Sequence, residues 1–174
     1  MVIANTGKDP VQAVLTTVAV PIQPLPAGGH GMAIQRTYYR LDGTEANVTQ
    51  VQQNERYVVV LKIDEQNSWP SRVLVNDLLP AGFEIDNPRL MSSAELTNFG
   101  WLERTEAAHL EFRDDRFIAA FNRDGGSSRT ITLAYVVRAV TPGVFAHPAA
   151  TVEDMYRPQY AARTSTAVME VKEQ

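Results

Sequence analysis

The chain has 174 residues, of which 44% are hydrophobic and 21% charged, and its formal net charge is −4. This length suits one domain that buries a core without staples, and the lack of cysteine excludes disulfides, thiolate catalysis and cysteine-ligated zinc within it. The acidic balance, with lysine only at Lys8, Lys62 and Lys172, excludes a broad nucleic-acid surface.

The sequence contains neither a candidate membrane span nor a recognisable signal peptide. No apolar run approaches the length of a membrane span, and residues 1–5 have neither the basic start nor the apolar centre of a signal peptide. We therefore expect a cytosolic protein or an excised piece of an exported chain, with no direct membrane contact. Residues 1–174 are expected to form a single domain, with a flexible lead-in over residues 1–10.

The first half of the chain predicts strands separated by turn residues. Pro21, Asp42-Gly43 and the segment Leu79-Pro80-Ala81-Gly82 supply the turns. β-branched and aromatic residues predict strands at residues 11–20, 32–41, 48–51, 56–64, 71–79 and 83–85.

The strand at 56–64 is the most apolar and is expected to be central. Val58 and Val60 lie on one of its faces, and a second set of large residues lies on the other, namely Tyr57, Val59, Leu61 and Ile63. A strand with two apolar faces is typical of the middle of a sheet.

The second half predicts one helical segment and further strands. Between residues 88 and 108 the period changes, and Leu90, Met91, Ala94, Glu95 and Leu96 favour one or two helical turns capped by Ser92 or Ser93. Strands are expected at residues 108–112, 116–121, 129–140 and 164–171. The whole pattern predicts an all-β fold, an antiparallel β-sandwich with one short helical segment.

The residue types that act in catalysis or metal binding in other proteins have structural interpretations in this sequence. The acidic pairs Asp114-Asp115 and Glu153-Asp154 suit turns, and adjacent strand residues point to opposite faces. The histidines lack metal-ligand spacing, and no nucleophile or phosphate-binding motif occurs. We expect no catalytic residue, no metal and no cofactor. Four arginines are interpreted as a solvated face, namely Arg36, Arg40, Arg138 and Arg163.

The segment 142–160 is expected to be a presented loop. Pro148 and Pro158 flank an adjacent Met155-Tyr156 pair. One interpretation is a stiffened connection with both side chains in the core, since Met and Tyr fill irregular gaps well. The other is that the prolines hold Met155 and Tyr156 toward a partner, where a thioether and an aromatic ring suit an apolar cleft.

Several motifs follow one another in order along the chain: Tyr38-Tyr39, Asp77-x-Leu79-Pro80-x-Gly82-Phe83-Glu84-Ile85, Asp114-Asp115-Arg116-Phe117, Tyr135-x-x-Arg138-Ala139-Val140-Thr141-Pro142-Gly143-x-Phe145 and Glu153-Asp154-Met155-Tyr156-x-Pro158. Together they resemble the C-terminal, receptor-binding-domain-like domain of bacterial α2-macroglobulins, from about residue 5 to the end. The Asp-x-Leu-Pro-x-Gly element alone is weak evidence for the family. The order in which it occurs with the other motifs makes the resemblance specific.

The resemblance implies a macroglobulin or Ig-like β-sandwich in a protease inhibitor. In that family an invading protease cuts a bait region, and a thioester in another domain captures it. A thioester needs a cysteine, which this chain lacks, so the implied role is non-catalytic shielding of a thioester domain of the same polypeptide until bait cleavage. The implied shielding loop contains Met155 as the covering residue, with Tyr156, Glu153 and Pro158. An apolar lid slows thioester hydrolysis by excluding water.

The resemblance also implies partners and a location. Proteases would be trapped through the full-length protein, which would be a periplasmic, inner-membrane-anchored lipoprotein partnered with a penicillin-binding protein. Receptor binding through helical lysines, as in animal relatives, is not carried over because residues 88–108 have no lysine.

Two other hypotheses stay open. One is an Ig-like adhesin or stalk module of a bacterial envelope protein. The other is a small β-sandwich hydrolase, which would need Glu111, Asp115 and Glu153 to converge in a concave site.

Overall fold

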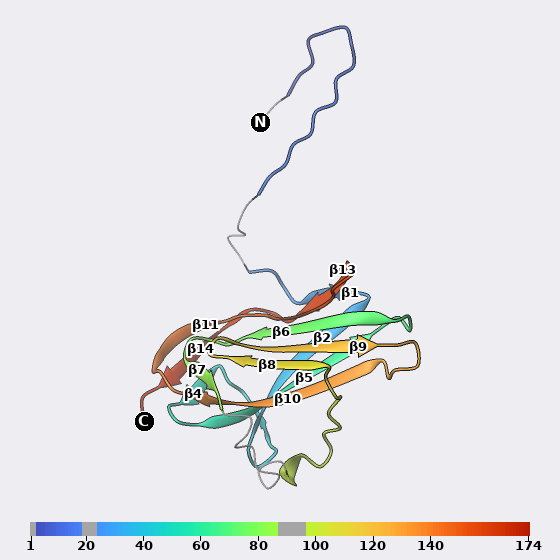
Figure 1. The fold of residues 1–174 in the computed structure, drawn as a ribbon. Coiled ribbons are helices and arrows are strands. Elements are labelled where there is room, and N and C mark those ends of the chain that lie inside the picture. Colours follow the sequence, from blue (N-terminus) through green and yellow to red (C-terminus); the bar gives the residue numbers. More distant parts are fainter. Residues whose placement is uncertain (1–2, 19–23, 87–96) are drawn as a thin grey trace.

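The computed structural model describes residues 3–18, 24–86 and 97–174. From residue 28 onward the described chain forms layered β-sheets, and the N-terminal segment runs away from them (Figure 1). The fold is nearly all β, in agreement with the predicted β-sandwich. Within the described residues no helix is long and apolar enough to cross a membrane.

Among the described residues the larger sheet has six strands, and all of its pairs are antiparallel. Along β6 the side chains alternate, so that Val73, Val75 and Asp77 are buried while their neighbours face outward. The strands, in spatial order, are β1 (Gly28–His30), β13 (Arg157–Arg163), β12 (Ala150–Asp154), β6 (Ser71–Leu78), β9 (Arg116–Arg123) and β8 (His109–Arg113).

The second sheet, over the part of the chain that the structure describes, has five strands, and β5 lies in the centre as predicted. Val58 and Val60 pack with Phe99 and Val136 in a small cluster on one face, and the other face of β5 enters the main core. The strands, in spatial order, are β3 (Glu45–Ala46), β2 (Met32–Arg40), β5 (Arg56–Glu65), β10 (Thr130–Ala139) and β7 (Phe83–Ile85).

A third, three-stranded sheet contains β11 (Gly143–His147), β14 (Ala167–Lys172) and β4 (Gln50–Gln52), in that order. β14 is antiparallel to β11 and parallel to β4. Met169 and Val171 of β14 are buried in the main core. The end of the chain is therefore part of the packed domain.

The main core contains large aromatic side chains from the two principal sheets. Phe117 of β9 stacks on Tyr135 of β10, with their ring centres 4.4 Å apart. Tyr57 and Phe83 form a second stacked pair at 6.2 Å. Such pairs add ~1 kcal/mol beyond the burial of their surface.

The predicted strand at 11–20 is wrong for residues 11–18, which are exposed and have no regular secondary structure. β-branched composition favours a strand only where a neighbouring strand supplies hydrogen bonds and cover, and the sandwich supplies neither here. Residues 19–20 lie outside the described residues.

The predicted helical residues Leu90 to Leu96 also lie outside the described residues. The helical structure described nearby is the short 3₁₀ turn η1 (Thr97–Phe99), whose last residue, Phe99, is buried.

The loop expected over 142–160 is wrong, because that segment contains β11, β12 and the start of β13. Pro148 lies between β11 and β12, where the chain passes from the small sheet to the large one. Pro158 lies within β13, at a position that β1 does not pair with, since β1 reaches only residues 161–163. Both prolines therefore occupy sites where a backbone donor is dispensable.

Candidate functional site

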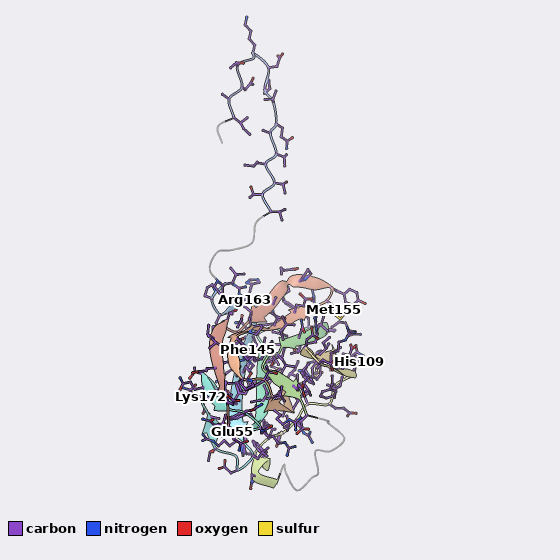
Figure 2. All side chains as sticks on the ribbon, turned by 90° about the vertical axis from the view of Figure 1, so that its left-hand side faces the viewer. Glu55, His109, Phe145, Met155, Arg163 and Lys172 are labelled. Atoms are coloured by element: carbon purple, nitrogen blue, oxygen red, sulfur yellow. The ribbon has the colours of Figure 1, made fainter. Side chains whose placement is uncertain are left out.

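The predicted loop residues Met155 and Tyr156 form the turn of the β12–β13 hairpin. Met155 is 54% exposed and Tyr156 is 81% exposed. Figure 2 labels Met155 at the periphery of the sandwich. Of the two interpretations drawn from the sequence, core packing is wrong, and projection from the surface agrees with the structure.

A buried carboxylate organises this turn. Asp154 is only 1% exposed. Its Oδ1 accepts a hydrogen bond from the Tyr156 N–H at 3.1 Å, and its Oδ2 accepts one from Arg157 Nε at 2.8 Å. The Met155 N–H donates to the carbonyl oxygen of Arg72 in β6 at 2.8 Å. The turn backbone is thus fixed while both side chains at its tip remain free of the core.

Arg157 connects the turn to the segment between β5 and β6 through a hydrogen bond and a cation–π contact. Its Nη2 donates to the Pro70 carbonyl oxygen at 2.5 Å, and its guanidinium lies over the Trp69 ring, 5.1 Å from the ring centre. Trp69 in turn contacts Tyr160 edge-on at 5.2 Å, and Tyr160 stacks on His30 of β1 at 5.4 Å. These four side chains form a continuous support behind the Met155–Tyr156 turn.

An irregularity in the strand pairing makes room for this support. Glu153 pairs with Ala161, but the next residue, Asp154, pairs with Arg157, so residues 158–160 form a bulge in β13. Pro158 lies in the bulge and is exposed, as is Glu153 on β12. The hairpin therefore brings Glu153, Met155, Tyr156 and Pro158, the four predicted loop residues, into one local structure.

A buried polar network, which no pattern in the sequence indicates, links the sheets. Arg36 Nη1 contacts Asp77 Oδ1 at 2.5 Å, and Tyr135 Oη donates to Asp77 Oδ2 at 2.7 Å. Arg36 Nη2 also donates to the Pro148 carbonyl oxygen at 2.7 Å. The prediction that Arg36 belongs to a solvated face is wrong, because its side chain is only 5% exposed. Arg40 and Arg138 are exposed, and Arg163 is half-buried.

His147 joins the edge of this network through a 2.7 Å hydrogen bond between its Nε2 and Tyr38 Oη. Burial, with a contribution from the positive charge of Arg36, lowers the pKa of His147 to about 3. Burial raises the pKa of Asp77 although Arg36 and Tyr135 favour its charged form, and burial and Asp77 raise the pKa of Tyr135. His147 is therefore neutral near pH 7, and the network positions the β11–β12 connection.

The carboxylates considered for hydrolysis do not form an acid-base pair. Glu111 pairs with Arg113 at 2.6 Å and Asp115 with Arg116 at 2.5 Å, each with a near neighbour in the chain. Glu153 lies on β12, which is separated from β8 by β6 and β9. Over the described ranges, no group of three His, Cys, Asp or Glu side chains suits a metal ion.

The comparisons with known proteins agree with this architecture. Residues 31–159 match the family model of the bacterial α2-macroglobulin MG10 domain. The chain is 35% identical over 170 residues to an Escherichia coli α2-macroglobulin, and 35% identical over 160 residues to one from Xylella fastidiosa, covering 92% and 87% of this chain. In both cases it spans about 10% of the relative's length.

Solved structures give the same result. The native E. coli α2-macroglobulin fragment from domain MG7 to the C-terminus superposes with a TM-score of 0.73 at 33% identity, covering 86% of this chain and 25% of that one. A Salmonella α2-macroglobulin that was reacted with methylamine gives a TM-score of 0.74 at 31% identity, covering 87% of this chain and 10% of that one.

The fold is that of a macroglobulin-like β-sandwich domain. Because the family match extends over most of the chain, the chain belongs to the bacterial α2-macroglobulin family and contains its MG10 domain.

Proposed function

We propose that this chain is the thioester-shielding domain of a bacterial α2-macroglobulin-type protease inhibitor, with the Met155–Tyr156 turn as the lid. The observation that carries the proposal is an exposed methionine and tyrosine at the tip of a hairpin whose backbone is fixed by the buried Asp154. Two large apolar groups held outward in this way contribute nothing to their own core.

A lid must exclude water without reacting itself. The Met155 thioether and the Tyr156 ring offer apolar, deformable surface, which suits the cover of an electrophile that hydrolyses when water reaches it. Because the turn is held in place before docking, little conformational entropy is lost when it covers the thioester. Bait cleavage would release the lid by removing the contacts that favour the docked state.

Solved structures of relatives support a part in protease trapping. One E. coli structure is of α2-macroglobulin activated by porcine elastase, and the Salmonella protein was reacted with methylamine. We extend to this chain a part in trapping proteases through a longer polypeptide, in which its partner is the thioester domain. Anchoring in the periplasm as an inner-membrane lipoprotein, and a penicillin-binding protein as partner, belong to the same proposal.

The adhesin or stalk alternative is not favoured by the family match, and the arginine pairing of Glu111 and Asp115 gives the hydrolase no support. No observation favours a second function over the shielding role.

The test is thioester reactivity in the full-length inhibitor that contains this chain. Met155→Ala and Tyr156→Ala should each raise the rate of methylamine incorporation at the thioester several-fold, with the melting temperature unchanged. Val168→Ala, which truncates an exposed apolar residue in the three-stranded sheet, is the matched control and should leave the rate unchanged. An unaltered thioester lifetime in both turn variants would reject the shielding role.

A further inference from the structure

A cavity lies on the outer face of the five-stranded sheet, on the side away from the main core. It has a volume of about 340 Å³ and is lined by side chains of β2, β5 and β10 and of the segment that follows η1. This volume is at the lower end of the range for small-molecule sites, about 300–1,000 Å³. The Met155–Tyr156 turn belongs to the other sheet, so the shielding role makes no use of this cavity.

Trp101 forms one wall of the cavity. The residue is 55% exposed, and its ring lies 5.3 Å from that of Tyr39 and 6.1 Å from that of Phe99, measured between ring centres. Phe99 is buried and packs with Val58 in the small cluster on this face of the sheet. The indole of Trp101 is therefore supported from the sheet while more than half of the residue stays accessible.

Hydrogen bonds on both sides of Trp101 hold this wall in place. Before it, Asn98 Nδ2 donates to the Leu41 carbonyl oxygen at 3.0 Å. After it, the Thr105 N–H donates to the Thr132 carbonyl oxygen at 2.8 Å, and the Thr132 N–H donates to Thr105 Oγ1 at 3.0 Å. Because the segment is fixed in this way, a ligand that stacks on the indole has little ordering entropy to overcome.

The sheet supplies a row of polar side chains beside this wall. Gln35 of β2 pairs with Lys62 of β5, and Lys62 pairs with Thr132 of β10. Neighbouring strands lie about 4.8 Å apart, so the three side chains follow one another across the same face. Among the described residues none of these side chains has a hydrogen-bond or ion-pair partner. The cavity thus combines an aromatic wall with unused donors and acceptors.

The charges at the cavity narrow the class of ligand. Lys62 and Glu103 both line it, so a ligand with a full charge of either sign meets a like charge. Lysine and glutamate are also depleted in the cores of protein–protein interfaces, and the net charge of −4 disfavours nucleic acid. These properties favour a neutral ligand that has one apolar face and several hydroxyl groups.

We propose that this cavity binds a short neutral oligosaccharide built of pyranose rings. The axial C–H groups of a pyranose carry slight positive charge and complement the negative face of the Trp101 indole. The sugar hydroxyls both donate and accept, so they can bond to the Gln35 amide, the Lys62 ammonium and the Thr132 hydroxyl. A pyranose ring therefore uses both kinds of surface that the cavity presents.

The experiment is titration of the 174-residue chain with cellotriose and with chitotriose. In a Trp69→Phe background the tryptophan emission reports on Trp101 alone, since the chain has two tryptophans. At least one trimer should change this emission saturably, with a dissociation constant below about 1 mM. Sorbitol, which has hydroxyl groups but no ring, should cause no saturable change. The absence of saturation with both trimers up to about 10 mM would overturn the inference.

Variants test the wall and the polar row separately, with affinity measured by calorimetry. Trp101→Ala should weaken trimer binding by at least about 10-fold, the equivalent of one aromatic stack. Gln35→Ala, at an exposed position, should weaken it several-fold with the melting temperature unchanged. Gln52→Ala removes an exposed glutamine of the three-stranded sheet and is the matched control, which should bind as the wild type does. Equal affinities of the two glutamine variants would overturn the assignment of the polar row.

Two further probes and the longer protein distinguish other occupants. Adenosine can stack on the indole without a pyranose, and choline is a cation that aromatic rings attract. Tighter binding of either one than of both trimers would overturn the inference. Loss of trimer binding in the full-length polypeptide would also overturn it, because another domain would then cover the cavity. These outcomes are independent of the lid, whose test is methylamine incorporation.

Discussion

Arg157 and Asp154, three residues apart across the tip of the β12–β13 hairpin, form an ion pair of 2.8 Å in which the carboxylate is buried and the guanidinium is only partly covered. The same carboxylate accepts the Tyr156 N–H. A single buried charge thus holds both the backbone of the turn and the arginine that joins it to Trp69. Substitutions of this pair should affect the turn more than their position on the surface suggests.

Arg157→Ala is expected to destabilise the chain by ~2 kcal/mol, because it removes the charged hydrogen-bond donor of the buried Asp154 carboxylate. Urea unfolding measures the change. The matched control is Arg116→Ala, which breaks an exposed pair with Asp115 and should have little effect. Equal effects of the two substitutions would contradict the organising role of Asp154.

Tyr135→Phe should cost about 1–2 kcal/mol, since the buried Asp77 loses one hydrogen-bond donor while the stacking of residue 135 on Phe117 is kept. The free energy of unfolding in urea gives the magnitude. Tyr57→Phe removes a hydroxyl that bonds to the more exposed Glu55 and serves as the control, with a smaller expected loss. A cost for Tyr135→Phe no larger than that of the control would show that Arg36 alone satisfies Asp77.

His147 should make stability depend on pH. Its folded pKa is lowered to about 3 by burial and by Arg36, so between pH 6.5 and 3 the unfolded chain binds a proton that the folded chain does not. The contribution of His147 to the free energy of unfolding is therefore fully present above pH 6.5 and falls by ~1.4 kcal/mol per pH unit below it. Asp77, whose pKa is raised by burial, acts in the opposite direction, because the folded chain keeps its proton to a higher pH than the unfolded chain and stability from Asp77 falls as the pH rises.

The measurement is the difference in unfolding free energy between the wild type and His147→Gln from pH 7.5 to 4.5. The glutamine can keep a hydrogen bond to Tyr38 but does not titrate, so its profile should be flatter over this range. Because both proteins retain Asp77, its contribution largely cancels. Parallel profiles would show that His147 becomes protonated without a cost in the folded state.

The sequence predicts the parts of this fold that depend on local pattern. The two apolar faces of residues 56–64 predict a central strand, and β5 is central. The hairpin at β12–β13 was missed because Pro158 and the acidic residues beside Met155 indicate a loop, whereas a bulge and an uncovered edge accommodate them.

The buried network was missed for a different reason. Arg36 and Asp77 are 41 positions apart in the chain, and nothing in the local pattern of either residue indicates its partner. The alternation of β2 places Arg36 and Tyr38 on the same face, but whether that face is covered depends on β6, β11 and β12. Residues 11–18 show the reverse case, because their composition favours a strand but they pair with no strand in the described part of the chain.

Gly31→Ala should weaken the aromatic support behind the turn. Gly31 has φ +68°, which L side chains rarely adopt, and a Cβ there would lie 2.3 Å from Cδ1 of Tyr160. Alanine should therefore strain the backbone by ~1 kcal/mol and displace Tyr160 from Trp69 and His30.

Fluorescence in a Trp101→Phe background isolates Trp69, because the chain has two tryptophans. Gly31→Ala should shift the Trp69 emission and lower the melting temperature. Gly125→Ala, at a glycine without positive φ and with a milder contact of 3.1 Å to the Ser68 carbonyl oxygen, is the control and should change both less. An unchanged Trp69 spectrum in the Gly31→Ala protein would show that Tyr160 holds its place without help from Gly31.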